Sequence, residues 1–164
     1  MPHSHFGPAR PAARRQRRKL VWATLDQSIA MGAQQVKIVD LLSQLELAGV
    51  SKLGVTVMRV HGRLLFPTGV TQKWEVAIGV NPMTTVGTQL PNPNGDNDID
   101  WMIFDRPMQT FSGATVDADT SYTVDLKSRR KVDEMGQTLT LNLWASAISA
   151  GTVEAFFRTL VALP

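Results

Sequence analysis

Six basic side chains are concentrated near the N-terminus, and no acidic residue occurs among the first 19 positions. These residues are Arg10, Arg14, Arg15, Arg17, Arg18 and Lys19. Guanidinium and ammonium groups at this density bind phosphates through charge and counterion release, without reading a base sequence. We therefore predict that this segment binds a polyanion such as nucleic acid. A solubilising tail or a nuclear-import-like address is the alternative interpretation.

The rest of the chain has the opposite charge balance. The whole chain has 17 Lys+Arg and 14 Asp+Glu, so removing the six basic residues of the arm leaves 11 against 14 and a formal charge of −3 for residues 20–164. A domain that reads nucleic acid usually keeps a basic patch on its folded surface. The balance therefore indicates a different role for the folded part, such as contacting copies of itself.

A second set of basic groups lies on a candidate strand at 53–66. Arg59, His61 and Arg63 are spaced by two, which places them on one face of a strand. This cationic stripe is suited to phosphates or carboxylates, and a solvated strand face is an equally good interpretation. No nucleophile-elbow pattern is present to make His61 a catalytic base, and the chain contains no cysteine. We therefore predict that the protein is not an enzyme.

Alternating carboxylates occupy a Pro- and Gly-rich stretch. Asp96, Asp98 and Asp100 supply oxygen ligands of the kind that calcium prefers. However, Gly95 precedes the run, and Pro107 stands where an EF-hand loop requires Glu. An acidic turn-rich loop is the default interpretation. A calcium ion at a subunit interface, or a contact with a basic surface of a neighbouring copy, is the alternative, and no other cofactor is predicted.

Two further features suggest contacts between subunits. Arg129 and Lys131 share one face at the end of a candidate strand, where like charges disfavour open edge pairing or form salt bridges with a neighbour. Trp144 lies on the strand face opposite a row of leucines, so we predict an exposed aromatic anchor. Trp74 alternates with apolar residues in a clean period-two pattern over 70–80, which predicts a half-buried strand with Trp74 in the core.

The elements that must position these residues are mainly strands, because the dominant period from Leu20 onward is two. Asp40 is a candidate cap for one short helix that ends at Leu47. The segment 1–19 has little to bury, so we predict a disordered arm, followed by one domain over 20–164. The predicted strands are 20–29, 33–39, 53–66, 70–80, 100–106, 121–130, 136–146 and 152–163.

Eight antiparallel strands in one domain predict an all-β sandwich, most economically a jelly roll of two four-stranded sheets. An immunoglobulin-like sandwich is the rival topology. No apolar run reaches the roughly 20 residues of a membrane-spanning helix, so no membrane partner is predicted.

An arginine-rich arm attached to about eight strands resembles the coat (capsid) proteins of small icosahedral viruses. The resemblance implies a shell domain over 20–164 whose many copies close into an icosahedral shell. It also implies that the arm faces viral genomic RNA or DNA. The protein would then lie in the virion, and in the host-cell cytoplasm during assembly. A phage accessory or decoration protein, or a small oligomeric nucleic-acid-binding protein, is the alternative.

Overall fold

The computed structural model describes residues 18–32, 36–66, 74–83, 100–105, 121–145 and 149–164, with the backbone alone at 100–105 and 149–150. These residues form strands β1 (Leu20–Gly32), β2 (Val36–Asp40), β3 (Thr56–Leu65), β4 (Trp74–Pro82), β5 (Asp100–Asp105), β6 (Ser121–Lys131), β7 (Gln137–Ala145) and β8 (Ser149–Ala162), and one helix, α1 (Ser43–Leu47). The expected all-β class with one short helix is confirmed. The division at residue 19 stays a prediction, because residues 1–17 lie outside the described part.

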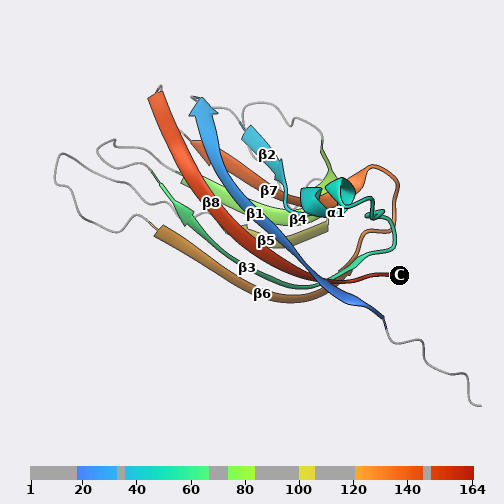
Figure 1. Ribbon diagram of the computed structural model, residues 1–164. Helices are drawn as coiled ribbons and strands as arrows, with labels where there is room; N and C mark the ends of the chain where they lie inside the picture. The colour runs from blue at the N-terminus through green and yellow to red at the C-terminus, as the bar shows by residue number, and fades with distance from the viewer. Residues whose placement is uncertain (1–17, 33–35, 67–73, 84–99, 106–120, 146–148) are drawn as a thin grey trace, which may run out of the picture.

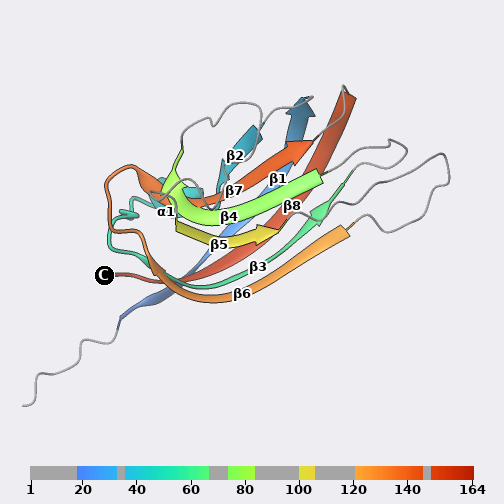
Figure 2. The same cartoon turned by 180° about the vertical axis from the view of Figure 1, so that it is seen from behind.

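The strands form two antiparallel sheets that face each other (Figures 1 and 2). One sheet has the order β1-β8-β3-β6 and is called the arm-bearing sheet, because β1 continues from the basic segment. The second sheet has the order β2-β7-β4-β5. Except for β4 and β5, strands consecutive in the chain lie in different sheets. This double Greek-key arrangement is a jelly roll. An immunoglobulin-like sandwich would pair the first two strands, whereas β1 pairs with β8.

The core lies between the inner faces of the two sheets. In β3, Val60 and Leu64 are fully buried. His61 and Arg63, which lie between them in the sequence, are exposed. This alternation follows from the pleat, which sends successive side chains to opposite faces. Each fully buried Val or Leu contributes about 1.5–3 kcal/mol through the hydrophobic effect.

The second sheet departs from the half-buried pattern that its sequence predicts. Trp74 is buried in the core as expected, but Ala77 on the other face of β4 is also fully buried. Ala77 belongs to a small apolar cluster with Val36, and Ile38 and Trp144 pack against it. The outer face of this sheet is therefore covered over β2, β7 and β4, which period-two patterning cannot reveal.

Two glycines occupy positions that disfavour a larger side chain, one through its backbone conformation and one through a close contact. Gly49 follows α1 with a φ of +72°, and its N–H donates to the Glu46 carbonyl, which ends the helix. Gly62 lies on β3 opposite Phe157 of β8, and a Cβ there would lie 2.2 Å from the Phe157 ring. Asp40, the expected helix cap, instead accepts a bond from the N–H of Leu42, just before the helix.

Candidate functional site

The arm joins the body at one corner of the arm-bearing sheet. Arg18 and Lys19 are described, whereas Arg10, Arg14, Arg15 and Arg17 lie outside the described residues. The Lys19 carbonyl accepts a hydrogen bond from the N–H of Leu163 (2.9 Å). The Arg18 guanidinium donates to the Thr56 hydroxyl (3.5 Å). The basic segment therefore continues directly from the paired start of β1 and end of β8.

The charge of the body is divided unequally between its two sheets. The strands of the arm-bearing sheet contain seven basic residues against three acidic ones, Asp26, Asp125 and Glu154, a formal balance of +4. The strands of the second sheet contain one basic residue, Lys37, against four acidic ones, a balance of −3. The seven basic residues are Arg59, Arg63, Lys127, Arg129, Arg130, Lys131 and Arg158. The formal charge of −3 for residues 20–164 therefore hides a basic arm-bearing sheet, and a role of the folded part in contacting copies of itself stays a prediction.

Arg59, His61 and Arg63 share the outer face of β3, as their spacing predicts. Arg59 is held by Asp125 of β6 through two hydrogen bonds, from Nε to Oδ1 (2.9 Å) and from Nη2 to Oδ2 (2.8 Å). His61 Nδ1 lies 3.9 Å from the same carboxylate. Sequence spacing could not reveal Asp125 as a partner, because 66 residues separate it from Arg59.

The Arg59–Asp125 pair keeps both groups charged. The hydrogen bond from Arg59 holds the pKa of Asp125 below its usual range, and the same bond raises the pKa of Arg59. The pair neutralises part of the cationic stripe that the sequence predicts on β3. It also fixes the Arg59 guanidinium in a defined orientation over the junction of β3 and β6.

The basic end of β6 lies at the same end of the arm-bearing sheet as the root of the arm. Lys131 lies opposite Thr56 in the β3–β6 ladder, and Thr56 accepts the hydrogen bond from Arg18. Arg129 and Lys131 are both exposed. The root of the arm and the end of β6, which are distant in sequence, thus both place basic side chains beside Thr56 at the same end of the arm-bearing sheet. A role for Arg129 and Lys131 in subunit contacts stays a prediction.

Among the described side chains, the exposed tryptophan is Trp22 and not Trp144, for which exposure was predicted. Trp144 is half-buried on the outer face of the second sheet, where it packs against the cluster of Val36 and Ala77. Trp22 of β1 is 44% exposed and is the most exposed of the tryptophans whose side chains are described. Trp144 was predicted to be an exposed anchor, whereas the structure shows it half-buried, and its role in subunit contacts stays a prediction.

The predicted calcium site falls mainly outside the described part of the chain. Asp96 and Asp98 lie outside it, and only the backbone of Asp100 is placed, at the start of β5. Among the side chains that the structure describes, no group of three His, Cys, Asp or Glu residues could hold a metal ion. The calcium prediction stays untested. No described helix is long and apolar enough to cross a membrane.

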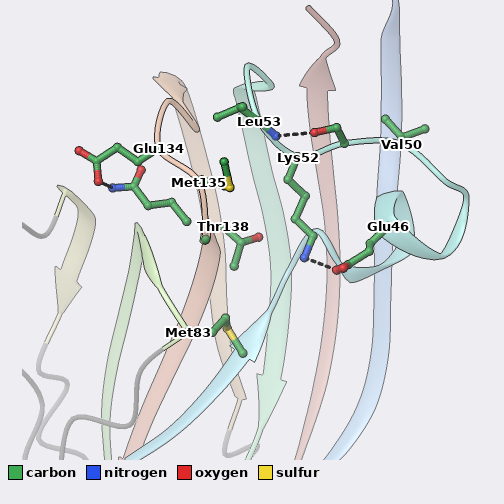
Figure 3. A pocket seen from close by; sticks show the side chains of 11 residues that line it. Glu46, Val50, Lys52, Leu53, Met83, Glu134, Met135 and Thr138 are labelled. Carbon is green, nitrogen blue, oxygen red and sulfur yellow. Dashed lines mark hydrogen bonds and ion pairs between the residues drawn. The ribbon is translucent and has the colours of Figure 1, made fainter.

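An open pocket of about 270 Å³ lies at one end of the sandwich (Figure 3). The loop between α1 and β3, the end of β4 and the turn between β6 and β7 contribute its walls. Its apolar lining includes Leu53, Met83 and Met135, which are 45%, 47% and 91% exposed, and Glu46 and Glu134 add carboxylates. We call this surface the end pocket.

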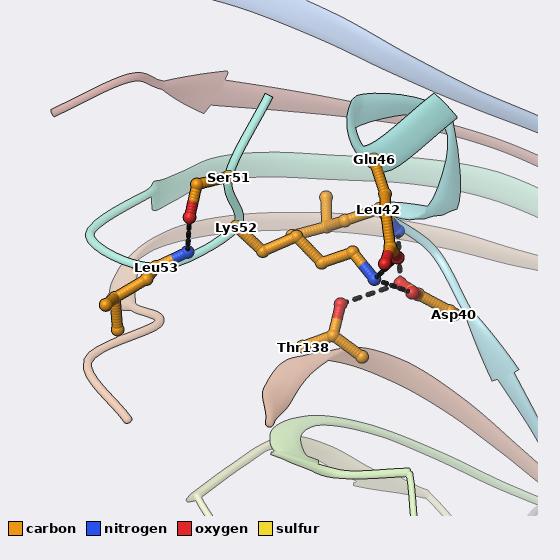
Figure 4. Close-up of polar contacts among 7 residues, drawn as sticks. All are labelled: Asp40, Leu42, Glu46, Ser51, Lys52, Leu53 and Thr138. Carbon is orange, nitrogen blue, oxygen red and sulfur yellow. Dashed lines mark hydrogen bonds and ion pairs between the residues drawn. The ribbon is translucent and has the colours of Figure 1, made fainter. Parts of the chain in front are cut away.

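A charged cluster anchors the wall of the end pocket (Figure 4). Lys52 contacts the carboxylates of both Asp40 and Glu46. The other oxygen of Asp40 accepts hydrogen bonds from the Leu42 N–H (2.8 Å) and the Thr138 hydroxyl (2.7 Å). Burial lowers the pKa of Lys52, but its hydrogen bonds to Asp40 and Glu46 outweigh this effect and raise it overall. The cluster ties the loop before β3 to β2 and β7, which makes the pocket wall a defined surface.

No family model matches the chain, and no curated protein matches it. Solved structures do match, and most of those compared come from viruses. The Nora virus structure has a TM-score of 0.46 at 11% identity, covering 99% of this chain and 65% of the viral one. The tobacco streak virus coat protein has a TM-score of 0.45 at 12% identity, with 88% and 86% covered. A Bacillus endospore appendage pilus has a TM-score of 0.41 at 11% identity, with 95% and 98% covered. At these identities the similarity concerns the fold alone.

Proposed function

We propose that this protein is a viral capsid protein that self-assembles into an icosahedral shell and packages nucleic acid through its basic N-terminal arm. The observation that carries the proposal is a jelly roll whose basic N-terminal segment enters at the same end of the arm-bearing sheet as the basic end of β6. Jelly rolls form the shell domains of viral capsids. No enzymatic activity is part of the proposal.

The charge division between the sheets supports an oriented subunit. A shell protein needs one surface suited to the packaged polyanion and other surfaces suited to contacts with neighbours. The arm-bearing sheet has the balance of +4 and continues into the arm, whereas the second sheet has the balance of −3. Six arm charges per copy, repeated over many copies, add up to a large cationic lining through multivalency.

The apolar side chains around the end pocket support contacts between copies. Leu53, Met83 and Met135 line it, and all three side chains are exposed. Large apolar side chains gathered on one surface mark an interaction site. In a closed symmetric shell, the partner that covers such a surface is another copy of the same chain.

The first experiment is negative-stain electron microscopy of the purified full-length protein, with absorbance at 260 and 280 nm measured on the same fraction. We expect closed, uniform particles that contain nucleic acid. Monomers or small oligomers that bind nucleic acid would contradict shell formation and favour a small oligomeric binding protein. Binding only to shells formed by another protein would favour an accessory or decoration protein.

The role of the arm is tested by replacing Arg10, Arg14, Arg15 and Arg17 together with glutamine. Single-stranded binding loses about 0.7 in the slope of log affinity against log salt for each phosphate contact, so we expect a slope smaller by about 3. The matched control replaces the same four arginines with lysine, which retains the charge. An unchanged nucleic-acid content and salt slope in the glutamine variant would contradict the role of the arm.

A further inference from the structure

The outer face of the arm-bearing sheet carries exposed aromatic rings among guanidinium groups. The strand register sets these side chains in rows across β1, β8 and β3, which lie side by side in Figures 1 and 2. The first row contains Trp22, Leu160 and Arg59. The second contains Thr24, Arg158 and His61. The third contains Asp26, Phe156 and Arg63.

We propose that this face binds single-stranded nucleic acid by stacking unpaired bases on Trp22 and Phe156, while basic side chains of β3, β6 and β8 contact the phosphates. The inference rests on the proposed function, because it takes the packaged nucleic acid as the ligand. It adds a folded binding surface to the arm and specifies which form of nucleic acid that surface takes. Proteins that bind single-stranded nucleic acid commonly combine aromatic rings with cationic groups. Any base can stack on such a ring, because every base has a π-face.

Both rings are accessible without serving the core. Trp22 is 44% exposed and Phe156 is 40% exposed, although β8 is an inner strand of its sheet. The adjacent Phe157 points to the opposite face and is 2% exposed in the core. The two consecutive phenylalanines thus send one ring inward and one ring outward. Core packing accounts for Phe157 but not for Phe156.

Arg158 links one of these rings to the charged groups. Its guanidinium carbon lies 5.2 Å from the centre of the Trp22 ring, in a cation–π contact that holds the guanidinium over β1 and β8. Such contacts are weak at exposed sites. A base can therefore compete for the ring while Arg158 turns toward the adjacent phosphate.

The spacing of the two rings favours a single strand over a duplex. Trp22 is opposite Leu160, and Phe156 is four residues from Leu160 along β8. At about 3.3 Å per residue, the two rings are rooted about 13 Å apart along the strands. In a duplex, each internal base is paired and stacked between its neighbours, so it offers no free face to either ring. A single strand can splay its bases and place one on each ring.

Positive charge increases along this face toward the root of the arm. Glu154, at the far end, accepts a hydrogen bond from Ser28, and Asp26 lies in the row of Phe156. Toward the arm, Lys127 lies opposite Arg59, and the basic end of β6 follows. A strand stacked on Phe156 and then Trp22 would thus run directly into the region of the arm, so the two surfaces would share one ligand.

A fluorescently labelled, unstructured single-stranded 20-mer and a duplex of equal length serve as probes for the full-length protein. We expect Trp22→Leu and Phe156→Leu each to weaken single-strand binding about 5- to 150-fold, the range for one stacked base. The salt slope and the duplex affinity should not change, because no charge is removed. Trp22→Phe is the matched control and should retain most of the affinity. Circular dichroism establishes that each variant is folded.

The outcomes separate this inference from the proposed function. If both leucine variants keep the single-strand affinity while the arm variant loses nucleic-acid binding, the sheet face is not a binding surface. That result would overturn this inference and leave the coat-protein proposal standing. Particles that fail to form while the affinity stays unchanged would show that another copy covers this face, which also overturns the inference. An equal loss of duplex affinity would show that the rings do not select single strands.

Discussion

The charged cluster at the end pocket predicts a large stability loss in Asp40→Ala. The Asp40 side chain is 14% exposed and accepts hydrogen bonds from Leu42 and Thr138, in addition to its ion pair with Lys52. Without it, Lys52, which is 17% exposed, retains only Glu46, which is 73% exposed. Breaking a buried ion pair costs about 3–5 kcal/mol. Because these groups are partly solvated, we expect the free energy of unfolding to fall by about 2–4 kcal/mol.

Urea-induced unfolding at fixed protein concentration measures this loss. With a slope of about 2 kcal/mol per molar urea, the midpoint should fall by about 1–2 M. Asp40→Asn should lose less, because an amide oxygen still accepts the bonds from Leu42 and Thr138. Asp133→Ala, at an exposed position, is the control and should stay within about 0.5 kcal/mol of the parent chain. An Asp40→Ala loss no larger than that of the control would refute the reasoning.

Two further predictions follow from close contacts within the arm-bearing sheet. Gly62→Ala places a Cβ 2.2 Å from the buried Phe157 ring, so we expect overpacking to cost about 1–3 kcal/mol in urea unfolding, and an unchanged midpoint would contradict the close approach. Arg59→Gln should raise the titration midpoint of the Asp125 carboxyl, measured by NMR, because the hydrogen bond from Arg59 lowers its pKa. The pair stabilises the fold above the ordinary aspartate pKa of about 3.9, and this contribution is lost as the pH falls through the lowered value. An unchanged midpoint would show that the pair is not formed.

The sequence alone was sufficient for the local features of this fold. Period-two spacing predicted that Arg59, His61 and Arg63 share one face of β3, and the structure confirms it, with Val60 and Leu64 buried on the other face. The helix ends at Leu47 as predicted, because Gly49 allows the left-handed conformation that ends it. These features depend on the preferences of neighbouring residues, which the order of amino acids contains directly.

Which residues lie side by side on neighbouring strands could not be predicted from the sequence. Period two assigns a residue to a face of a strand, but it does not say which strand lies alongside. Asp125 beside Arg59 and Glu154 beside Ser28 follow from the jelly-roll order, and the latter pair is separated by 126 residues. The formal charge of −3 for residues 20–164 likewise gave no sign of the basic arm-bearing sheet. A sum over the chain does not say in which sheet each charged residue lies.

What covers a sheet face was also decided only by the tertiary structure. Trp144 and Trp22 both lie on outward faces of their strands, yet Trp144 is half-buried beside Val36 and Trp22 is exposed beside Arg158. The composition and periodicity of this chain determined an all-β sandwich with a basic N-terminal segment. The end pocket and the row of rings and guanidiniums arose only when distant segments packed together, because the contacts that form them are non-local.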